Sequence, residues 1–102
     1  MSLDPLSERQ KRHLRGRGHA LHPLVRLGQA GLTAAVVHET ERALHDHELV
    51  KVRTPPLERT AREALLRELA QRTGSTLVQR IGNIGLLYRA HPTAPRLLLP
   101  AP

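Results

Sequence analysis

The sequence predicts a single α/β domain of the two-layer α+β type, with the element order α-β-α-β-α-β-β around a four-stranded mixed sheet. The chain has 102 residues, which is the length of one domain. Segments with helical periodicity are separated by short segments that are either wholly apolar or switch between apolar and polar residues, as strands do. This order is typical of β-α-β units. Two further strand-like segments flank a glycine-rich turn near the end, so an antiparallel hairpin is expected to join the parallel strands.

The first helix is predicted over residues 7–15. Ser7 and Gln10 have the spacing of a capping box, and two glycines follow the last turn. Residues 24–27 are expected to form a short strand after a His-Pro pair, which favours extended backbone. Arg26 alternates out of this otherwise apolar run, so one face of the strand is expected to be accessible.

The second helix is predicted over residues 33–47, with Thr40 in its apolar stripe able to bond the carbonyl one turn back. Residues 49–53 alternate apolar and basic side chains, as in a half-buried strand. The third helix, residues 58–72, carries four opposite-charge pairs at i,i+4 spacing. Its buried side is predicted to consist of Ala61, Ala64, Leu65, Leu66 and Leu69.

Two strands, residues 76–81 and 86–89, are predicted to flank a hairpin turn at residues 82–85. The domain is therefore expected to span residues 4–92. The proline-rich tail, residues 93–102, is expected to be a loosely held strap without secondary structure.

Composition narrows the possible functions. The formal net charge is +7, there is no cysteine, and the only Phe, Trp or Tyr residue is Tyr88. Disulfides and thiolate metal sites are therefore excluded, and no apolar run is long enough to span a membrane. The N-terminus is basic where a secretory signal needs an apolar stretch, so a cytoplasmic protein is expected.

The excess of basic residues favours a polyanionic partner, and nucleic acid is the first candidate. Residues 1–26 and 49–102 are net basic, whereas residues 27–48 are net acidic, so a basic patch is expected rather than a uniform coat. The single aromatic excludes an RNA-recognition motif, which stacks bases on two or three sheet aromatics. The element order does not fit a helix-turn-helix. Recognition of phosphates and RNA shape is the expected mode.

The pair Gly28-x-x-Gly31 lies between a predicted strand and a predicted helix. Two glycines let backbone amides approach a ligand closely, and the helix N-terminus that follows attracts anions. KH domains clamp nucleic-acid backbone with such a loop. The glycine spacing alone is weak evidence for a phosphate-binding loop, because a plain strand-to-helix turn can contain the same two glycines. The spacing recurs at Gly82 and Gly85, where it predicts only a hairpin turn.

Enzymatic and metal-binding functions are not expected. The sequence contains no Ser/His/Asp arrangement, no Walker loop and no dinucleotide fingerprint, so no cofactor and no small-molecule substrate are predicted. Histidines occur in two close groupings, His19-x-x-His22 and His45-Asp46-His47. Neither grouping has the spacing of a known zinc motif, so no metal site is predicted.

Several spaced motifs resemble the CRM domain family, whose stand-alone bacterial form is the YhbY type. In the first half they are Leu6-Ser7-x-x-Gln10-Lys11-x-x-Leu14-Arg15-Gly16, His19-x-Leu21-x-Pro23-Leu24-Val25 and Leu27-Gly28-Gln29-Ala30-Gly31-Leu32-Thr33. In the second half they are His47-Glu48-Leu49-Val50-Lys51-Val52, Ile81-Gly82 and Leu87-Tyr88-Arg89. The resemblance covers about residues 4–92.

This resemblance implies a fold similar to the C-terminal domain of translation initiation factor 3. It also implies RNA binding, with bacterial members associating with precursors of the large ribosomal subunit. Many relatives carry a lysine inside the glycine loop, where this chain has Gln29 and Ala30. A phosphate contact would then depend on backbone amides and neighbouring arginines. Arg17 and Thr40 stand where relatives often have apolar residues, and Arg17 is expected to add to the basic patch.

The resulting hypothesis is a non-catalytic, monomeric protein that binds ribosomal RNA in large-subunit precursors and assists ribosome assembly. The predicted contact residues are Arg9, Lys11, Arg12, Arg15, Arg26, Gly28, Gln29, Ala30, Gly31, Lys51 and Arg53, with Arg80 and Arg89 as weaker candidates. Two alternatives remain open. One is a protein-interaction module that docks its basic face on an acidic partner, and the other is a general nucleic-acid or DNA binder.

Overall fold

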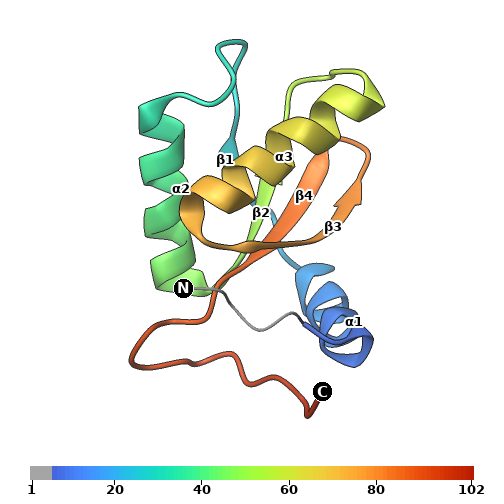
Figure 1. Cartoon of the computed structure of the whole chain (residues 1–102), viewed down its shortest axis with the longest axis vertical. Helices are drawn as coiled ribbons and strands as arrows, with labels where there is room; N and C mark the ends of the chain where they lie inside the picture. Colours follow the sequence, from blue (N-terminus) through green and yellow to red (C-terminus); the bar gives the residue numbers. More distant parts are fainter. Residues whose placement is uncertain (1–5) are drawn as a thin grey trace.

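The computed structural model describes residues 6–102, so the predicted domain start at residue 4 lies outside the described residues. Seven elements follow the predicted order (Figure 1). The helices are α1 (Glu8–Gly18), α2 (Ala34–His47) and α3 (Arg59–Thr73). The strands are β1 (Pro23–Arg26), β2 (Leu49–Arg53), β3 (Thr76–Ile81) and β4 (Ile84–Tyr88). Within the described chain, no helix has the length and apolar character needed to cross a membrane.

The four strands form one mixed sheet in the order β1-β2-β4-β3. β1 and β2 are parallel and joined through α2, whereas β4 is antiparallel to both β2 and β3. The predicted mixed sheet is therefore confirmed. β2 and β3 are not neighbours, because the β3–β4 hairpin folds β4 back between them, where Leu49 pairs with Tyr88 and Arg53 with Ile84.

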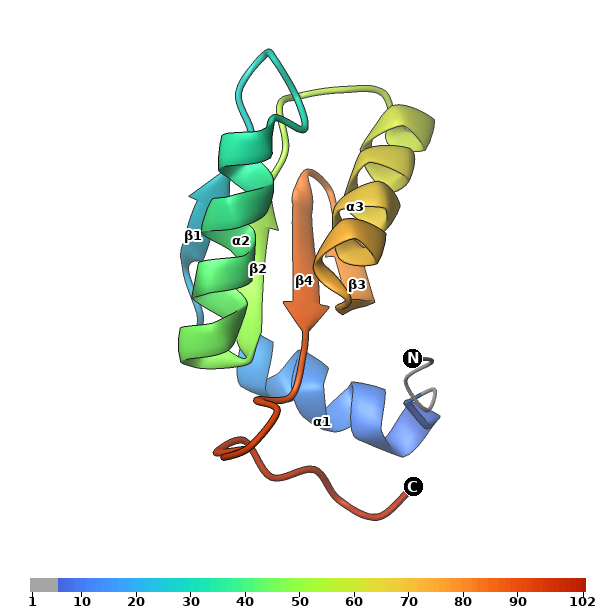
Figure 2. The same ribbon diagram turned by 60° about the vertical axis from the view of Figure 1, so that its left-hand side comes forward.

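The two faces of the sheet are covered unequally. α2 and α3 lie together on one face (Figure 2). This confirms the prediction that at least two helices cover one face of the sheet. Their main core contains Val25, Leu27, Leu44, Val50, Val52, Leu66, Leu69, Ala70 and Leu87. The alternate strand residues point to the other face, where α1 lies across one end of the sheet. This second cluster contains Leu14, Leu49, Val78, Leu86 and Tyr88. Within residues 6–102, no helix covers the rest of that face, which we call the open face.

Local sequence signals are confirmed at several positions. The Ser7 hydroxyl accepts from the Gln10 amide at 3.1 Å while the Gln10 side chain accepts from the Ser7 amide at 3.0 Å, which completes the capping box. The Thr40 hydroxyl donates to the Val36 carbonyl at 2.8 Å, as expected. Gly82 has a φ of 58° at the first central position of the hairpin, where a two-residue turn favours glycine.

Two predicted boundaries are wrong. α1 continues through Gly16 and ends at Gly18. Gly18 is packed so tightly that a Cβ atom there would lie 2.7 Å from a methyl carbon of Leu86. Gly18 is thus the last residue of the helix as well as a packing residue. The last strand begins at Ile84, since only Gly82 and Asn83 form the turn.

The buried side of α3 also differs from the prediction. Ala61 and Ala64 are exposed, whereas Leu66, Leu69, Ala70 and Thr73 are buried. The buried residues belong to the C-terminal half of the helix, because that half packs on the sheet. Helical periodicity alone does not reveal which part of a helix has a partner surface.

The C-terminal tail is held more firmly than predicted. It has no helix or strand, but Leu97 and Leu99 pack against the second cluster, and the Gln10 side chain donates to the Pro100 carbonyl at 3.1 Å. The carboxylate of Glu48, 1% exposed at the end of α2, accepts from three backbone amides of the tail region. These donors are His91 at 3.0 Å, Arg96 at 2.8 Å and Leu97 at 3.0 Å.

Candidate nucleic-acid interface

The glycine loop protrudes between β1 and α2, at the end of the molecule opposite α1 (Figure 1). Gly28 to Gly31 forms a tight turn in which the Gly31 amide donates to the Gly28 carbonyl at 3.0 Å. Gly31 has a φ of 70°, a conformation that glycine adopts without strain. Gln29 and Ala30 are exposed at the tip. The loop therefore presents its backbone to solvent.

The start of α2 adds further donors beside this loop. Thr33 caps the helix by accepting from the Val36 amide at 3.2 Å. The preceding amides of Ala34 and Ala35 belong to the first turn, whose N–H groups have no partner within the helix. Both residues are exposed, and no acidic residue occupies this first turn. The helix end thus retains its positive potential for an anion.

Two arginines stand next to the loop. Arg26 on β1 pairs in parallel register with Arg53 on β2, and both are exposed. A hollow of about 430 Å³ is lined by these two arginines together with Gly28, Gln29 and Asn83. Two residues of the glycine loop and both arginines therefore line one hollow.

Lys51 extends this basic surface along the open face. It lies two residues before Arg53 on β2, so the two side chains point to the same face of the sheet. Lys51 shares a second hollow with Arg17, at the end of α1. The structure therefore places Arg17, Lys51, Arg53 and Arg26 along one face, leading to the glycine loop.

The four predicted cations on α1, namely Arg9, Lys11, Arg12 and Arg15, lie at the end of the sheet opposite the loop (Figure 2). Lys11 is 3.9 Å from Glu8 and lines a hollow with Arg59 and Arg67 near the β3 edge. The predicted contact residues thus form two groups, with Lys51 between them on the open face.

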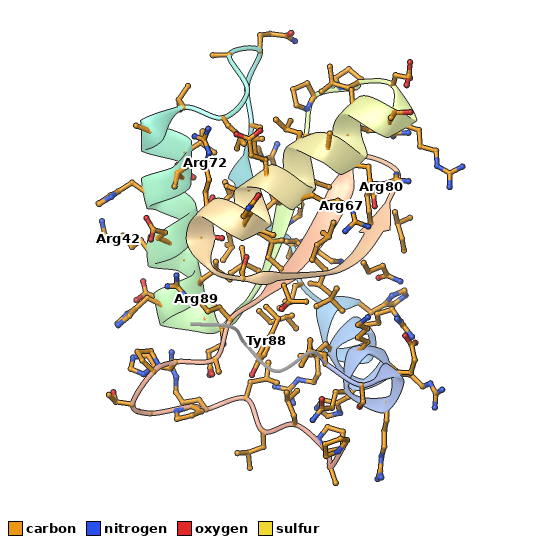
Figure 3. All side chains as sticks on the ribbon, viewed as in Figure 1. Arg42, Arg67, Arg72, Arg80, Tyr88 and Arg89 are labelled. Atoms are coloured by element: carbon orange, nitrogen blue, oxygen red, sulfur yellow. The ribbon has the colours of Figure 1, made fainter. Side chains whose placement is uncertain are left out.

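The two weaker candidates, Arg80 and Arg89, are labelled in Figure 3. Both have structural partners. Arg80 donates to Glu63 at 2.7 Å and to the Gly82 carbonyl at 2.8 Å. This contact with Arg80 is the main cause that lowers the pKa of Glu63. Arg89 donates to the Thr73 carbonyl at 2.7 Å, at the end of α3, and to the Glu41 carbonyl of α2 at 3.1 Å. Both arginines hold the fold together.

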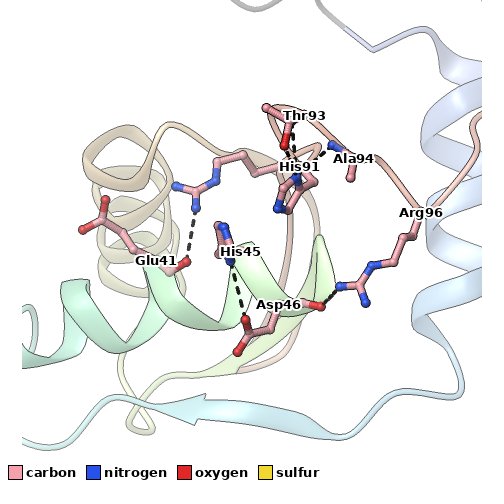
Figure 4. Close-up of polar contacts among 8 residues, drawn as sticks. Glu41, His45, Asp46, His91, Thr93, Ala94 and Arg96 are labelled. Atoms are coloured by element: carbon pink, nitrogen blue, oxygen red, sulfur yellow. Dashed lines mark hydrogen bonds and ion pairs between the residues drawn. The ribbon is translucent and has the colours of Figure 1, made fainter.

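His45 and Asp46, at the end of α2, contact residues of the C-terminal tail. The His45 ring lies 3.6 Å from the Asp46 carboxylate, and it contacts the His91 ring in a tilted arrangement with 4.6 Å between the ring centres (Figure 4). No cluster of three metal-ligating side chains occurs within residues 6–102. Arg96 also donates to the Asp46 carbonyl, so this region anchors the tail.

Sequence reasoning did not identify the role of Glu48. Its φ is 64°, a value that residues other than glycine rarely adopt. No local signal indicates this role, because the residue directly after the predicted second helix is a glutamate and not a glycine. Burial raises the pKa of Glu48, but the three tail amides and Arg96 outweigh this and hold the pKa below its ordinary value.

Comparisons with known proteins agree with this architecture. A probable RNA-binding protein of Pseudomonas aeruginosa is 46% identical over 87 residues, covering 85% of this chain and 84% of the relative. An RNA-binding protein of Haemophilus influenzae is 40% identical over 87 residues, covering 85% of this chain and 88% of the relative. The solution structure of a hypothetical Staphylococcus aureus protein, for which RNA binding has been proposed, superimposes with a TM-score of 0.82 at 29% identity. That match covers 94% of this chain and 100% of the other.

The sequence motifs, the mixed sheet with its protruding glycine loop and these similarities converge on one assignment. The CRS1 / YhbY (CRM) domain matches residues 6–89, which is most of the chain. The chain belongs to the CRS1 / YhbY (CRM) domain family.

Proposed function

We propose that this protein is a non-catalytic RNA-binding protein that associates with ribosomal RNA in precursors of the large ribosomal subunit and assists their assembly. The observation that carries the proposal is the line of cations on the open face, which leads from Arg17 past Lys51 to Arg26 and Arg53 beside the glycine loop. The names of the similar proteins support RNA as the partner. The ribosomal role follows from the resemblance to the family.

The chemistry of this surface favours the phosphate backbone. Guanidinium groups bind phosphate oxygens with two parallel hydrogen bonds, and backbone amides at a helix start add neutral donors. Tyr88 is buried in the second cluster, where burial, reinforced by the nearby Glu48 carboxylate, raises its pKa. It is therefore not available as a stacking platform. The protein acts as a monomer in the cytoplasm in this proposal.

The first test is the salt dependence of RNA affinity. If about six phosphates are neutralised, log K is expected to fall with log salt at a slope near −4 for single-stranded RNA. Fluorescence anisotropy with a labelled RNA at several potassium chloride concentrations measures this slope. A flat response would exclude an interface built on phosphate contacts.

The second test addresses the glycine loop. A Cβ atom added at Gly28 meets nothing within 4 Å, and its φ lies outside the left-handed region, so Gly28→Ala is not expected to lower the unfolding temperature. The added methyl group separates the loop backbone from a phosphate, so RNA affinity is expected to fall by about fivefold. Gly31→Ala is the comparison. Its φ of 70° predicts lower stability as well as lower affinity. Unchanged affinity of Gly28→Ala would remove the loop from the interface.

The ribosomal partner is tested by sedimentation of the tagged protein from bacterial lysate with RNA crosslink mapping. We expect it to migrate with large-subunit precursors and to crosslink to their RNA. Ribonuclease treatment distinguishes the alternative. Association that survives removal of the RNA would indicate docking on an acidic protein instead.

A further inference from the structure

A second hollow lies on the open face, bounded by the end of α1, strands β1 and β2, and the tail. Its volume is about 350 Å³, within the range of small-ligand pockets, which is about 300–1,000 Å³. Leucines from four parts of the chain line it: Leu21, Leu24, Leu49 and Leu97. Leu24 is 53% exposed although it lies on a strand, and Leu21 is 38% exposed. Clustered exposed leucines around a concavity indicate a surface that receives a partner.

The rim of this leucine hollow is basic. Arg17 and Lys51 line it, together with the exposed rings of His22 and His47, and no carboxylate is among its lining residues. Among the described residues, neither Arg17 nor Lys51 lies within ion-pairing distance of a carboxylate. The hollow therefore suits a ligand with a largely apolar body and an attached anion. A nucleotide has this composition, since the faces of its base are apolar and its phosphate is anionic.

The leucine hollow is continuous with the proposed RNA surface. Lys51 lines it and lies about 6.6 Å, two strand residues, from Arg53 beside the glycine loop. An RNA strand whose phosphates contact Arg53, Lys51 and Arg17 would pass along the edge of this hollow. An unpaired base of that strand can then turn into it, as bases do in proteins that recognise single-stranded RNA.

We infer that the leucine hollow receives one unpaired base of the bound RNA, with Arg17 and Lys51 holding the flanking phosphates. This inference rests on the proposed function and deepens it, because it predicts a preference for RNA with unpaired nucleotides. Contact with leucine side chains and histidine rings takes the place of the tyrosine or phenylalanine stacking that this chain cannot provide.

The test compares Leu24→Ser with the wild-type protein on two RNAs: a short single strand of mixed sequence, and the same strand annealed to its complement. We expect Leu24→Ser to weaken binding of the single strand about fivefold and to leave binding of the duplex unchanged. The slope of log K against log salt should stay the same, since no phosphate contact is removed. Leu57→Ser is the matched control, because Leu57 is 38% exposed and lies outside this hollow.

The outcomes separate the two proposals. If the wild-type protein binds neither RNA at low salt, RNA binding itself is overturned. If it binds both, and Leu24→Ser either behaves like Leu57→Ser or weakens both RNAs equally at unchanged unfolding temperature, the base site is overturned while RNA binding stands.

A titration without RNA gives an independent measurement. Uridine monophosphate is expected to shift the methyl NMR signals of Leu21, Leu24 and Leu97, whereas ribose 5-phosphate, which lacks the base, is expected to leave them in place. Equal shifts with both compounds, or none with uridine monophosphate, would contradict a base in the hollow.

Discussion

Glu48→Ala is expected to lower the free energy of unfolding by about 3 kcal/mol, more than a typical surface substitution. The Glu48 carboxylate is buried and accepts from the amides of His91, Arg96 and Leu97. Its loss leaves these donors without a partner unless the tail detaches and becomes hydrated. Urea denaturation measures the change in stability, and limited proteolysis reports whether the tail is released.

Two variants separate the contributions at this position. Glu48→Gln keeps one acceptor oxygen in place, so about half of the loss is expected. Glu48→Gly removes the side chain but relieves the strain of a φ of 64°, so it should be about 1 kcal/mol more stable than the alanine variant. Wild-type stability of Glu48→Ala would show that the tail contacts do not contribute.

The pH dependence of this effect has a defined sign. The pKa of Glu48 in the folded protein lies below its ordinary value of 4.5, because the tail amides and Arg96 outweigh the opposing effect of burial. The carboxylate therefore contributes its full stabilisation above about pH 4.5, and this stabilisation is lost as the pH falls through the lowered pKa. The stability difference between the wild-type protein and Glu48→Gln is expected to shrink over that acidic range.

The largest expected loss of RNA affinity follows from replacing Arg26 and Arg53 together with alanine. Both side chains are exposed, neighbouring in register and next to the glycine loop, so each is placed to contact a phosphate. Loss of two charged contacts is expected to weaken binding about a hundredfold at low salt, or ~3 kcal/mol. The salt slope for single-stranded RNA should become less steep by about 1.4.

The matched control removes two charges from the helical layer. Arg42 on α2 and Arg72 on α3 are exposed on the opposite side of the sheet (Figure 3). The double alanine variant changes the net charge by the same amount, so it tests the general effect of charge. We expect only a small loss, since solvent and salt screen distant charges. An equal loss in both double variants would contradict a localised interface on the open face.

Three arginines with the same chemistry differ in their surroundings. The Arg26 side chain was predicted to point to the accessible face of its strand, and it is exposed. Successive side chains of a strand point to opposite faces, so the local sequence alone determines this direction. Arg80 and Arg89 have the same chemistry, yet their guanidinium groups bind Glu63 and two helix carbonyls. The partners of Arg89 lie 16 and 48 residues away in the chain. No local pattern distinguishes such an arginine from one that faces solvent.

By itself, the sequence determined the order of the elements, the position of the glycine loop, the capping of the first helix and the basic, aromatic-poor chemistry. These features depend on side chains a few residues apart, where backbone geometry dictates which groups meet. Only the tertiary structure decided that α1 and the glycine loop lie at opposite ends of the sheet, and that the tail closes on Glu48. It also created the leucine hollow from four separate segments. Such features depend on contacts between distant parts of the chain, which form only when the whole sheet and its helices pack together.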